Sequence, residues 1–435
     1  MDIKREIKFA LHKLGFDKPR KHQVAPIKAL TNKQDTIVIA GTSAGKTTIY
    51  QTAGLVLQGL TVVIEPLLAL IYNQVKELQR KGIPADYIDS TRTKADMDKI
   101  LCKAQKGKLA FLYVTPERLQ NKSFISAMRQ TNLALLVVDE CHCITEWGYT
   151  FRDAYLCIGD FIQNLPNKPV ICACSATILE GSVDTITQSL HMRHPAVFRS
   201  DLKRNNLILL KKDVTSTKKT LEKRLESRLK ALKRCIKKYQ DTGAVMVYAL
   251  TTSYVDAIYN FLEEIYPGQV ARYHAKIQPE KLKRQMEMDF LQGKKKIMVA
   301  TSAFGMGIDV PDIELIIHFN APVSMTDYIQ QVGRAGRDGR KARCILFYDQ
   351  NGDDQKIVHS LRKKAVQTSK KAAHTIQKRY QQMLDFLSDT GCMRNAILQY
   401  QGQIEQAICK CCTNCARERK GYRTWNAKME SIHFR

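Results

Sequence analysis

Short apolar runs recur along the chain, separated by longer stretches in which apolar residues return with a helical period. Runs that are apolar at consecutive positions suit strands buried on both faces, and strands that alternate with helices are typical of βαβ units. The pattern therefore predicts an α/β protein built on parallel sheets. The runs are TIVIAG, LTVVIEP, LAFLYVTP, LALLVVDE and PVICACSAT in a first group, then GAVMVYAL, QVARYHA, KIMVATS, LIIHF and RCILFY in a second.

The two groups predict two α/β lobes with a boundary near residue 200, in RSDLKRNNL. Beyond Tyr348 the pattern changes to a Lys-rich helical region from Asp353 to Leu387, then to a Cys-rich segment and a polar end. We expect a first lobe at 1–199, a second at 200–348, a helical domain at 349–416 and a polar tail at 417–435.

Composition is that of an ordinary globular chain, with 44% hydrophobic and 26% charged residues among 435. No apolar stretch is long enough to cross a bilayer, and the N-terminus reads as an amphipathic helix rather than a signal peptide. We therefore expect an intracellular protein with no membrane partner, in the nucleus of a eukaryote or the cytoplasm of a bacterium. In that setting thirteen cysteines favour metal-ligand spacing over disulfides.

The charge balance adds a candidate partner. Lys and Arg number 69 against 42 Asp and Glu, for a net charge of +27, which predicts attraction to a polyanion such as nucleic acid. Solubility alone also explains such a balance, and the basic run at 218–238 fits a solvated helix face as well as a binding surface.

The segment AGTSAGKT at 40–47 has the form of a phosphate-binding loop. Small residues let backbone N–H groups close around phosphates, the Lys46 ammonium adds a point charge, and the Thr47 hydroxyl is a magnesium ligand. Gly45 and Thr48 complete the nucleotide-binding set that we expect at this loop.

An acidic pair follows about ninety residues later, in VVDECH at 137–142. Asp139 ends an apolar strand and is placed to hold Mg²⁺, and Glu140 is placed to polarise the attacking water as general base. The phosphate loop and the acidic pair together predict a motor driven by ATP hydrolysis.

The second group of strands has no phosphate loop, but it ends in QQVGRAGRDG at 330–339. Arg334 and Arg337 are three residues apart on an expected helix and could point together across a cleft as catalytic arginine fingers. A salt-bridged surface helix is the alternative.

Aromatic residues follow the acidic pair directly. Trp147, Tyr149 and Phe151 stand close to Arg152 and offer stacking surfaces to unpaired bases. By composition alone, packing into a core is the more common role of such residues.

Taken together and in this order, the motifs resemble the RecQ family of DNA helicases, within superfamily two, over about residues 10–416. The resemblance implies that Phe16 stacks on adenine while Arg20 and Gln23 contact it, within LGFDKPRKHQ. It also implies that EPLLAL (65–70) and YVTPERL (113–119) follow a nucleic-acid strand. For the loop that carries the aromatic residues 147–151, the resemblance implies contact with DNA through Trp147, Phe151 and Arg152.

Two further segments resemble family motifs. The resemblance implies that SAT at 175–177 couples hydrolysis to strand separation, and that ATSAFGMGIDVPD at 300–312 contacts the strand and the nucleotide through Gly305, Gly307 and Asp309. Departures from the family pattern are Glu65 for serine, Cys141 for alanine, Lys276 for glycine and Gln331 for glutamate. None of them removes a catalytic group.

Four cysteines have the C-x16-C-x2-C-x2-C spacing of the family's zinc site, although Cys411 adds an ambiguity to the register. Four thiolates leave no position for water, so this zinc is structural. The ligands expected are Cys392, Cys409, Cys412 and Cys415.

The fold we expect is two RecA-like lobes on parallel sheets, followed by a small helical zinc-binding domain. The function we expect is that of an ATP-dependent DNA helicase with ATP, Mg²⁺ and Zn²⁺, acting on single-stranded and duplex DNA in repair or recombination, and moving 3′ to 5′ by resemblance. Residues 416–435 alone follow the last cysteine, so we expect no winged-helix or RNase-D-like domain and weaker unwinding.

Two alternatives remain at this stage. The same lobes would serve an RNA helicase or a DNA translocase that does not unwind. A protein of another class, an annealing scaffold switched by ATP, would not need Glu140, Arg334 and Arg337. The sequence identifies no protein partner.

Overall fold

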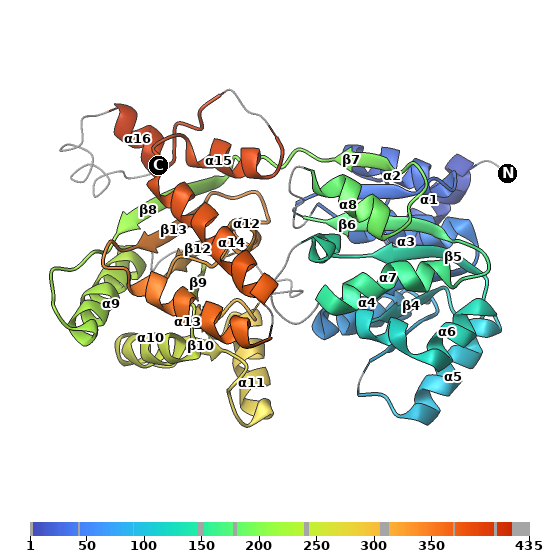
Figure 1. The fold of residues 1–435 in the computed structure, drawn as a ribbon, viewed down its shortest axis with the longest axis horizontal. Helices are drawn as coiled ribbons and strands as arrows, with labels where there is room; N and C mark the ends of the chain where they lie inside the picture. Colours follow the sequence, from blue (N-terminus) through green and yellow to red (C-terminus); the bar gives the residue numbers. More distant parts are fainter. Residues whose placement is uncertain are drawn as a thin grey trace. The chain divides into compact units, whose positions relative to one another are not determined.

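The computed structural model describes residues 3–41, 44–89, 91–145, 152–176, 181–238, 243–304, 313–368, 370–403 and 407–419. The chain divides into two compact units, Met1–Leu202 and Lys203–Arg435. Each unit contains its own parallel sheet with helices packed against it (Figure 1).

The sheet of the first unit has seven strands in the order β3-β4-β2-β5-β6-β1-β7, and each pairing is parallel. The central strands are buried at every position because helices cover both faces. The strands are β1 (Thr36–Ile39), β2 (Leu60–Ile64), β3 (Ala85–Ile88), β4 (Phe111–Val114), β5 (Leu133–Val138), β6 (Val170–Ser175) and β7 (Ala196–Arg199).

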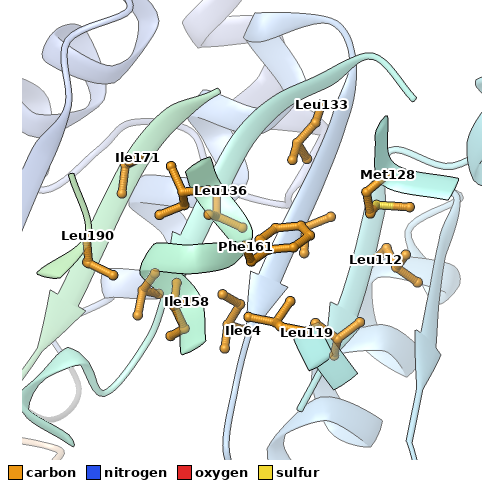
Figure 2. Close-up of a cluster of buried hydrophobic side chains, with 14 of the residues drawn as sticks. Ile64, Leu112, Leu119, Met128, Leu133, Leu136, Ile158, Phe161, Ile171 and Leu190 are labelled. Atoms are coloured by element: carbon orange, nitrogen blue, oxygen red, sulfur yellow. The ribbon is translucent and has the colours of Figure 1, made fainter. Parts of the chain in front are cut away.

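Alternate residues of these strands belong to two separate cores. One core packs under α5 to α8 and includes Ile64, Leu136 and Phe161 (Figure 2). The other packs under α2, α3 and α4. The helices are α1 (Ile3–Lys13), α2 (Lys21–Thr31), α3 (Lys46–Leu57), α4 (Leu68–Arg80), α5 (Lys94–Gln105), α6 (Lys122–Arg129), α7 (Arg152–Gln163) and α8 (Ser182–Ser189), with short 3₁₀ helices η1 (Pro116–Gln120) and η2 (Cys141–Ile144).

The sheet of the second unit has six strands in the order β10-β11-β9-β12-β13-β8, again with parallel pairings. Helices α9 and α10 cover one face, and α11, α12 and α14 contribute to the core on the other. The strands are β8 (Leu207–Asp213), β9 (Ala244–Tyr248), β10 (Val270–Tyr273), β11 (Ile297–Ala300), β12 (Ile313–His318) and β13 (Ala342–Tyr348). The helices are α9 (Leu221–Lys238), α10 (Thr252–Ile265), α11 (Glu280–Leu291), α12 (Met325–Val332), α13 (Asp353–Thr368), α14 (Lys370–Ser388), α15 (Met393–Tyr400) and α16 (Thr413–Arg419).

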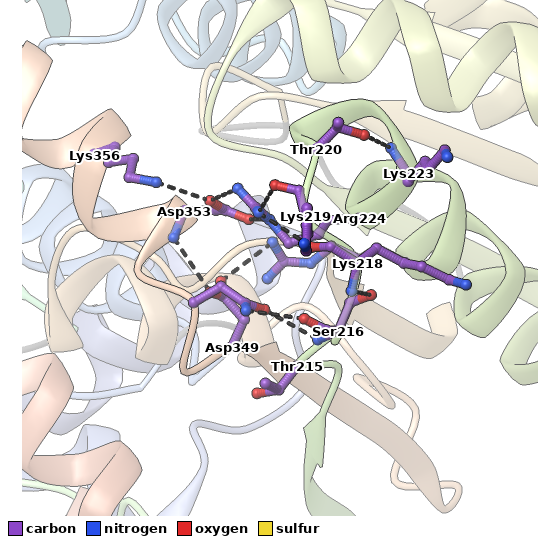
Figure 3. A network of polar contacts seen from close by, with 12 residues as sticks. Thr215, Ser216, Lys218, Lys219, Thr220, Lys223, Arg224, Asp349, Asp353 and Lys356 are labelled. Atoms are coloured by element: carbon purple, nitrogen blue, oxygen red, sulfur yellow. Dashed lines mark hydrogen bonds and ion pairs between the residues drawn. The ribbon is translucent and has the colours of Figure 1, made fainter.

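Two ion pairs fasten α9 to the beginning of α13. Arg224 donates to Asp353 from Nε at 2.7 Å and from Nη2 at 2.9 Å (Figure 3). Arg228 donates from both terminal nitrogens to Asp354 at 2.9 Å, and the two side chains of this second pair are only 7% and 6% exposed. These paired donors fix the basic helix α9 in place from its buried side.

The expected fold class of two parallel-sheet lobes with a C-terminal helical zinc-binding region is confirmed. All ten expected strands are present, whereas β3, β7 and β8 had no counterpart among the apolar runs. We expected a boundary near residue 200, and the chain divides into its two units after Leu202. The helical zinc-binding region belongs to the second unit.

Candidate nucleotide, strand and zinc sites

The phosphate loop joins the end of β1 to the beginning of α3. Residues 42–43 lie outside the described part of the chain, and Gly45 precedes the helix with a φ of 78°. That left-handed conformation suits glycine, and it lets the chain turn into the helix so that the N–H groups of its first turn face outward. Lys46 begins α3, and its ammonium donates to the carbonyl of Ala40 at 3.2 Å.

Residues of the expected adenine motif hold this loop. The Gln23 amide donates to the carbonyl of Gly45 at 3.0 Å, and its oxygen accepts from the N–H of Arg20 at 2.8 Å. The His22 Nε2 atom lies 2.8 Å from the carbonyl of Ala44. A Cβ atom on Gly45 would come within 2.5 Å of the Gln23 amide nitrogen, so a larger residue would displace Gln23 as well as strain the left-handed φ.

The acidic pair follows β5 at the same edge of the sheet, because the carboxyl ends of parallel strands meet there. The Asp139 N–H donates to the Ile64 carbonyl of β2 at 3.0 Å, and the Glu140 N–H donates to the Asp139 carboxylate at 2.9 Å. Glu140 has a φ of 49°, an uncommon conformation for a residue with a Cβ atom. His142 Nδ1 lies 3.1 Å from the Glu140 carboxylate and 2.9 Å from the Ser175 hydroxyl.

The electrostatics of this edge are those of a buried acidic cluster. Burial raises the pKa of Asp139 to about 6, and the nearby ammonium of Lys46 opposes that rise. Burial also raises the pKa of Glu65 well above its ordinary value, and the charges of Asp139 and Glu140 add to the effect. Such a cluster fits a divalent cation, which compensates carboxylate charge directly.

A groove lies above the ends of β2 and β4, at the carboxyl edge of the same sheet. It has a volume of about 780 Å³ and is formed by parts of the two expected strand-following motifs together with the η1–α6 segment. The N-terminus of α4 faces it without a side-chain cap, and such helix ends attract phosphate. The lining residues are Pro66, Leu67, Leu68, Thr115, Glu117, Arg118, Gln120 and Asn121.

The arginine segment of the second unit is not a helix, so that expectation is wrong. Helix α12 ends at Val332, and Gly336 has a φ of 54° that interrupts any continuation. Arg334 and Arg337 instead occupy a turn at 333–340, and both guanidinium groups lie close enough to the Tyr248 hydroxyl to act on its pKa. Arg334 is buried, and Arg337 is half-buried.

Several expected site residues lie outside the described part of the chain or are described only in part. Trp147, Phe151, Gly305 and Asp309 lie outside the described residues, and Arg152 is described only as the first residue of α7. The Phe16 ring is 42% exposed, with the Lys81 ammonium 5.6 Å from its centre.

Two further residues of the expected nucleotide set belong to α3. The Thr47 side chain hydrogen-bonds to Tyr50, and Thr48 is buried.

The four expected zinc ligands converge. The thiol sulfurs of Cys392, Cys409, Cys412 and Cys415 all lie within 4.8 Å of one another, and those of Cys409 and Cys415 are 3.9 Å apart. Sulfur atoms bound to one zinc at about 2.3 Å in a tetrahedron are separated by roughly 3.8 Å, so the cluster fits zinc.

Cys411 is not among the four cysteines whose sulfurs converge, and its own sulfur accepts from Arg394 at 3.5 Å. The segment is also tied to the sheet, since the Thr413 hydroxyl accepts the Lys211 N–H of β8 at 2.8 Å.

Among the described residues, every helix is too short or too polar to cross a bilayer.

The fold and these sites define a two-lobed helicase core. Residues 20–186 match the DEAD/DEAH box helicase model, residues 227–339 match the helicase conserved C-terminal domain, and residues 351–416 match the RecQ zinc-binding domain. A crystal structure of the DUF1998 helicase MrfA bound to DNA has the same fold, with a TM-score of 0.66 and 19% identity over 80% of this chain and 52% of that one.

The ATP-dependent DNA helicase RecQ of Bacillus subtilis (strain 168) is 33% identical over 417 residues, which cover 94% of this chain and 67% of that protein. The RecQ of Synechocystis sp. (strain ATCC 27184 / PCC 6803 / Kazusa) is 32% identical over 80% of this chain and 72% of its own length. The chain belongs to the RecQ family of ATP-dependent DNA helicases, and it spans about two thirds of the length of these relatives. Its cofactors are ATP with Mg²⁺ and structural Zn²⁺.

Sequence reasoning missed contacts that hold the site together. Tyr155 donates its hydroxyl to the Asp139 carbonyl at 2.8 Å, and His142 links Glu140 to Ser175. His142 lies in the VVDECH segment and Ser175 in the SAT segment, so their positions in these motifs could have indicated a role at the site. Nothing in the linear pattern indicates Tyr155.

Proposed function

We propose that this chain hydrolyses ATP to move along single-stranded DNA and to open duplex DNA, as a RecQ-type helicase. The observation that carries the proposal lies within the first unit. The phosphate loop, the acidic pair and the 780 Å³ groove share the carboxyl edge of one sheet. A bound strand and a bound nucleotide would then act on adjoining loops of one rigid element.

The residues at this edge have separable roles. The N–H groups at the beginning of α3 and the Lys46 ammonium would bind the phosphates, while Thr47 and Asp139 would hold Mg²⁺. Bound there, Mg²⁺ would supply positive charge against the charge that develops on the phosphates. Glu140 would accept the proton of the attacking water, with its carboxylate oriented by His142 at 3.1 Å.

The adenine contacts and the second-lobe residues complete the proposal. Gln23 would report adenine binding to the loop, because the same side chain holds the Gly45 carbonyl, with Phe16 and Arg20 beside it. Arg334 and Arg337 would act as arginine fingers. Gly305 and Asp309 would contribute to nucleotide binding, and Trp147, Phe151 and Arg152 would contact DNA, by resemblance.

Resemblance to the family is the support for the direction of movement, the pathway and the cellular compartment that we propose. We propose movement from 3′ to 5′ and a role in DNA repair or recombination, with action in the nucleus of a eukaryote or the cytoplasm of a bacterium. We also propose the domain limits 1–199, 200–348 and 349–416, followed by the tail 417–435.

The test is ATP hydrolysis measured with single-stranded DNA, with RNA and without nucleic acid, beside unwinding of a duplex with a 3′ single-stranded tail. We expect stimulation by DNA together with unwinding. Stimulation without unwinding indicates a translocase, stronger stimulation by RNA indicates an RNA helicase, and no stimulation by either refutes the proposal.

Two variants assign the chemistry. Lys46→Ala removes the positive charge that would bind the phosphates, so it should abolish both binding and turnover of ATP. Glu140→Gln keeps the shape of the side chain but cannot accept a proton, so ATP should still bind while turnover falls by about 10²- to 10⁴-fold. Hydrolysis by Glu140→Gln at the wild-type rate would show that Glu140 is not the general base.

A further inference from the structure

One guanidinium group binds three carbonyls of the turn that carries the two candidate fingers. Arg204 donates to three carbonyls of this arginine turn (residues 333–340), at 3.2 Å to Gly333, 2.6 Å to Ala335 and 2.9 Å to Gly336. These carbonyls flank Arg334 and come just before Arg337, so the direction of both side chains depends on the backbone that Arg204 fixes. The planar five-donor fork of arginine suits such a contact, whereas lysine offers only a point charge.

Asn206, two residues after Arg204, binds the same turn. Its amide donates to the carbonyl of Gly336 at 2.7 Å and to that of Arg340 at 2.8 Å. A Cβ atom on Gly336 would lie 2.5 Å from that amide nitrogen. Glycine is therefore required at 336 both by its φ of 54° and by the approach of Asn206.

The same short segment is also bound from the zinc region. Arg394 of α15 donates to the Asn205 side chain at 3.2 Å and to the Leu207 carbonyl at 3.0 Å. Residues 204–207 are thus held between the arginine turn and α15, immediately after the division between the two units at Leu202.

We propose that Arg204 is a positioning residue for ATP hydrolysis, which sets the geometry of the arginine turn from the segment where the chain enters the second unit. Arg204 touches neither phosphate nor water in this proposal and acts through Arg334 and Arg337. The proposal therefore rests on the assignment of those two residues as fingers. A shift of this segment is passed directly to the turn, since five hydrogen bonds join the two.

The test compares Arg204→Ala and Arg204→Lys with Arg284→Ala, which removes an exposed arginine of α11. The kcat and KM for ATP are measured at saturating single-stranded DNA, together with the Kd of a non-hydrolysable ATP analogue and the Tm. We expect Arg204→Ala to lower kcat by about 10- to 100-fold, the effect of a misplacement near 1 Å. KM and Kd should stay near wild type, Tm should fall because three carbonyls lose their donor, and Arg204→Lys should recover only part of the loss of kcat.

Added guanidinium provides a second readout. It should raise the kcat of Arg204→Ala by refilling the three-carbonyl contact, and it should leave Arg284→Ala unchanged. A merely structural role would instead weaken nucleotide binding in parallel with kcat, which would overturn the proposal. A wild-type kcat in Arg204→Ala would overturn it as well.

The finger assignment is tested separately. If Arg334→Ala and Arg337→Ala both retain wild-type kcat, the assignment under the proposed function fails and this inference fails with it. If those two variants lose turnover while Arg204→Ala does not, only this inference fails.

Discussion

Asp354→Ala should weaken the second unit more than an average substitution. Asp354 accepts two bonds from Arg228 at 2.9 Å, one from the Asn320 amide at 2.7 Å and one from the Ala321 N–H at 3.0 Å. Removing one partner of a buried ion pair costs about 3–5 kcal/mol, because the other charge stays buried. Asp349 lies 3.5 Å from Arg228 and compensates in part, so we expect about 3 kcal/mol.

The assay is thermal and urea unfolding, with hydrogen exchange of α9 as the local probe. A loss of about 3 kcal/mol corresponds to a fall in Tm of roughly 6–12 °C for a unit of this size. The control is Lys356→Ala, which removes an ion pair whose lysine side chain is 71% exposed and should change stability by less than about 1 kcal/mol.

A double variant separates charge burial from simple loss of packing. Arg228→Met with Asp354→Leu replaces the pair by apolar groups of similar size and should recover part of the loss; the recovery is incomplete because Asp349, the Asn320 amide and the Ala321 N–H lose their partners. If Asp354→Ala unfolds within 1 kcal/mol of wild type, the reasoning from burial is refuted.

Three further predictions concern the other sites. Gly45→Ala should raise the Kd of a fluorescent ATP analogue about tenfold, because its Cβ atom displaces the Gln23 amide, whereas Gly82→Ala has a comparable φ of 69° and open space and should bind normally. Burial lowers the pKa of His318 to about 3, so between pH 6.5 and 3 the unfolded chain binds a proton at this histidine that the folded chain does not. The free energy of unfolding should therefore fall as the pH drops through this range, by up to about 1.4 kcal/mol per pH unit. In urea titrations, His318→Gln should flatten that pH dependence. Zinc removal by a chelator should speed hydrogen exchange in α15, α16 and β8, and Cys411→Ser should keep zinc by metal analysis while serine at any of the four ligands loses it.

The central strands could be predicted because burial on both faces leaves uninterrupted apolar runs, as in LALLVVD. Strand β3, with the sequence ADYI, and strand β7, with the sequence AVFR, are edge strands of the first sheet with half-exposed or exposed positions. Their mixed composition gives no such run. A spacing of three between two arginines fits a helix and a turn equally well, and only the backbone at Gly336 decides between them.

The candidate site divides in the same way. The phosphate loop, the acidic pair and the zinc cysteines are local in sequence, so their spacing predicts the chemistry and the structure brings the described members together. Arg204 and Tyr155 act through backbone carbonyls, 131 residues away for Arg204 and 16 residues away for Tyr155. Backbone acceptors are the same in every residue, so such contacts leave no motif in a single sequence.

Strand β8 lies at the edge of its sheet, and the zinc segment binds it where the Thr413 hydroxyl accepts the Lys211 N–H. An uncovered edge with the sequence LILL is a template on which other chains can add strands, which is a common beginning of aggregation. We therefore expect the metal to protect the protein's solubility as well as its local fold. Material stripped of zinc during purification should form aggregates through β8, even though its ATP-binding unit is still correctly folded.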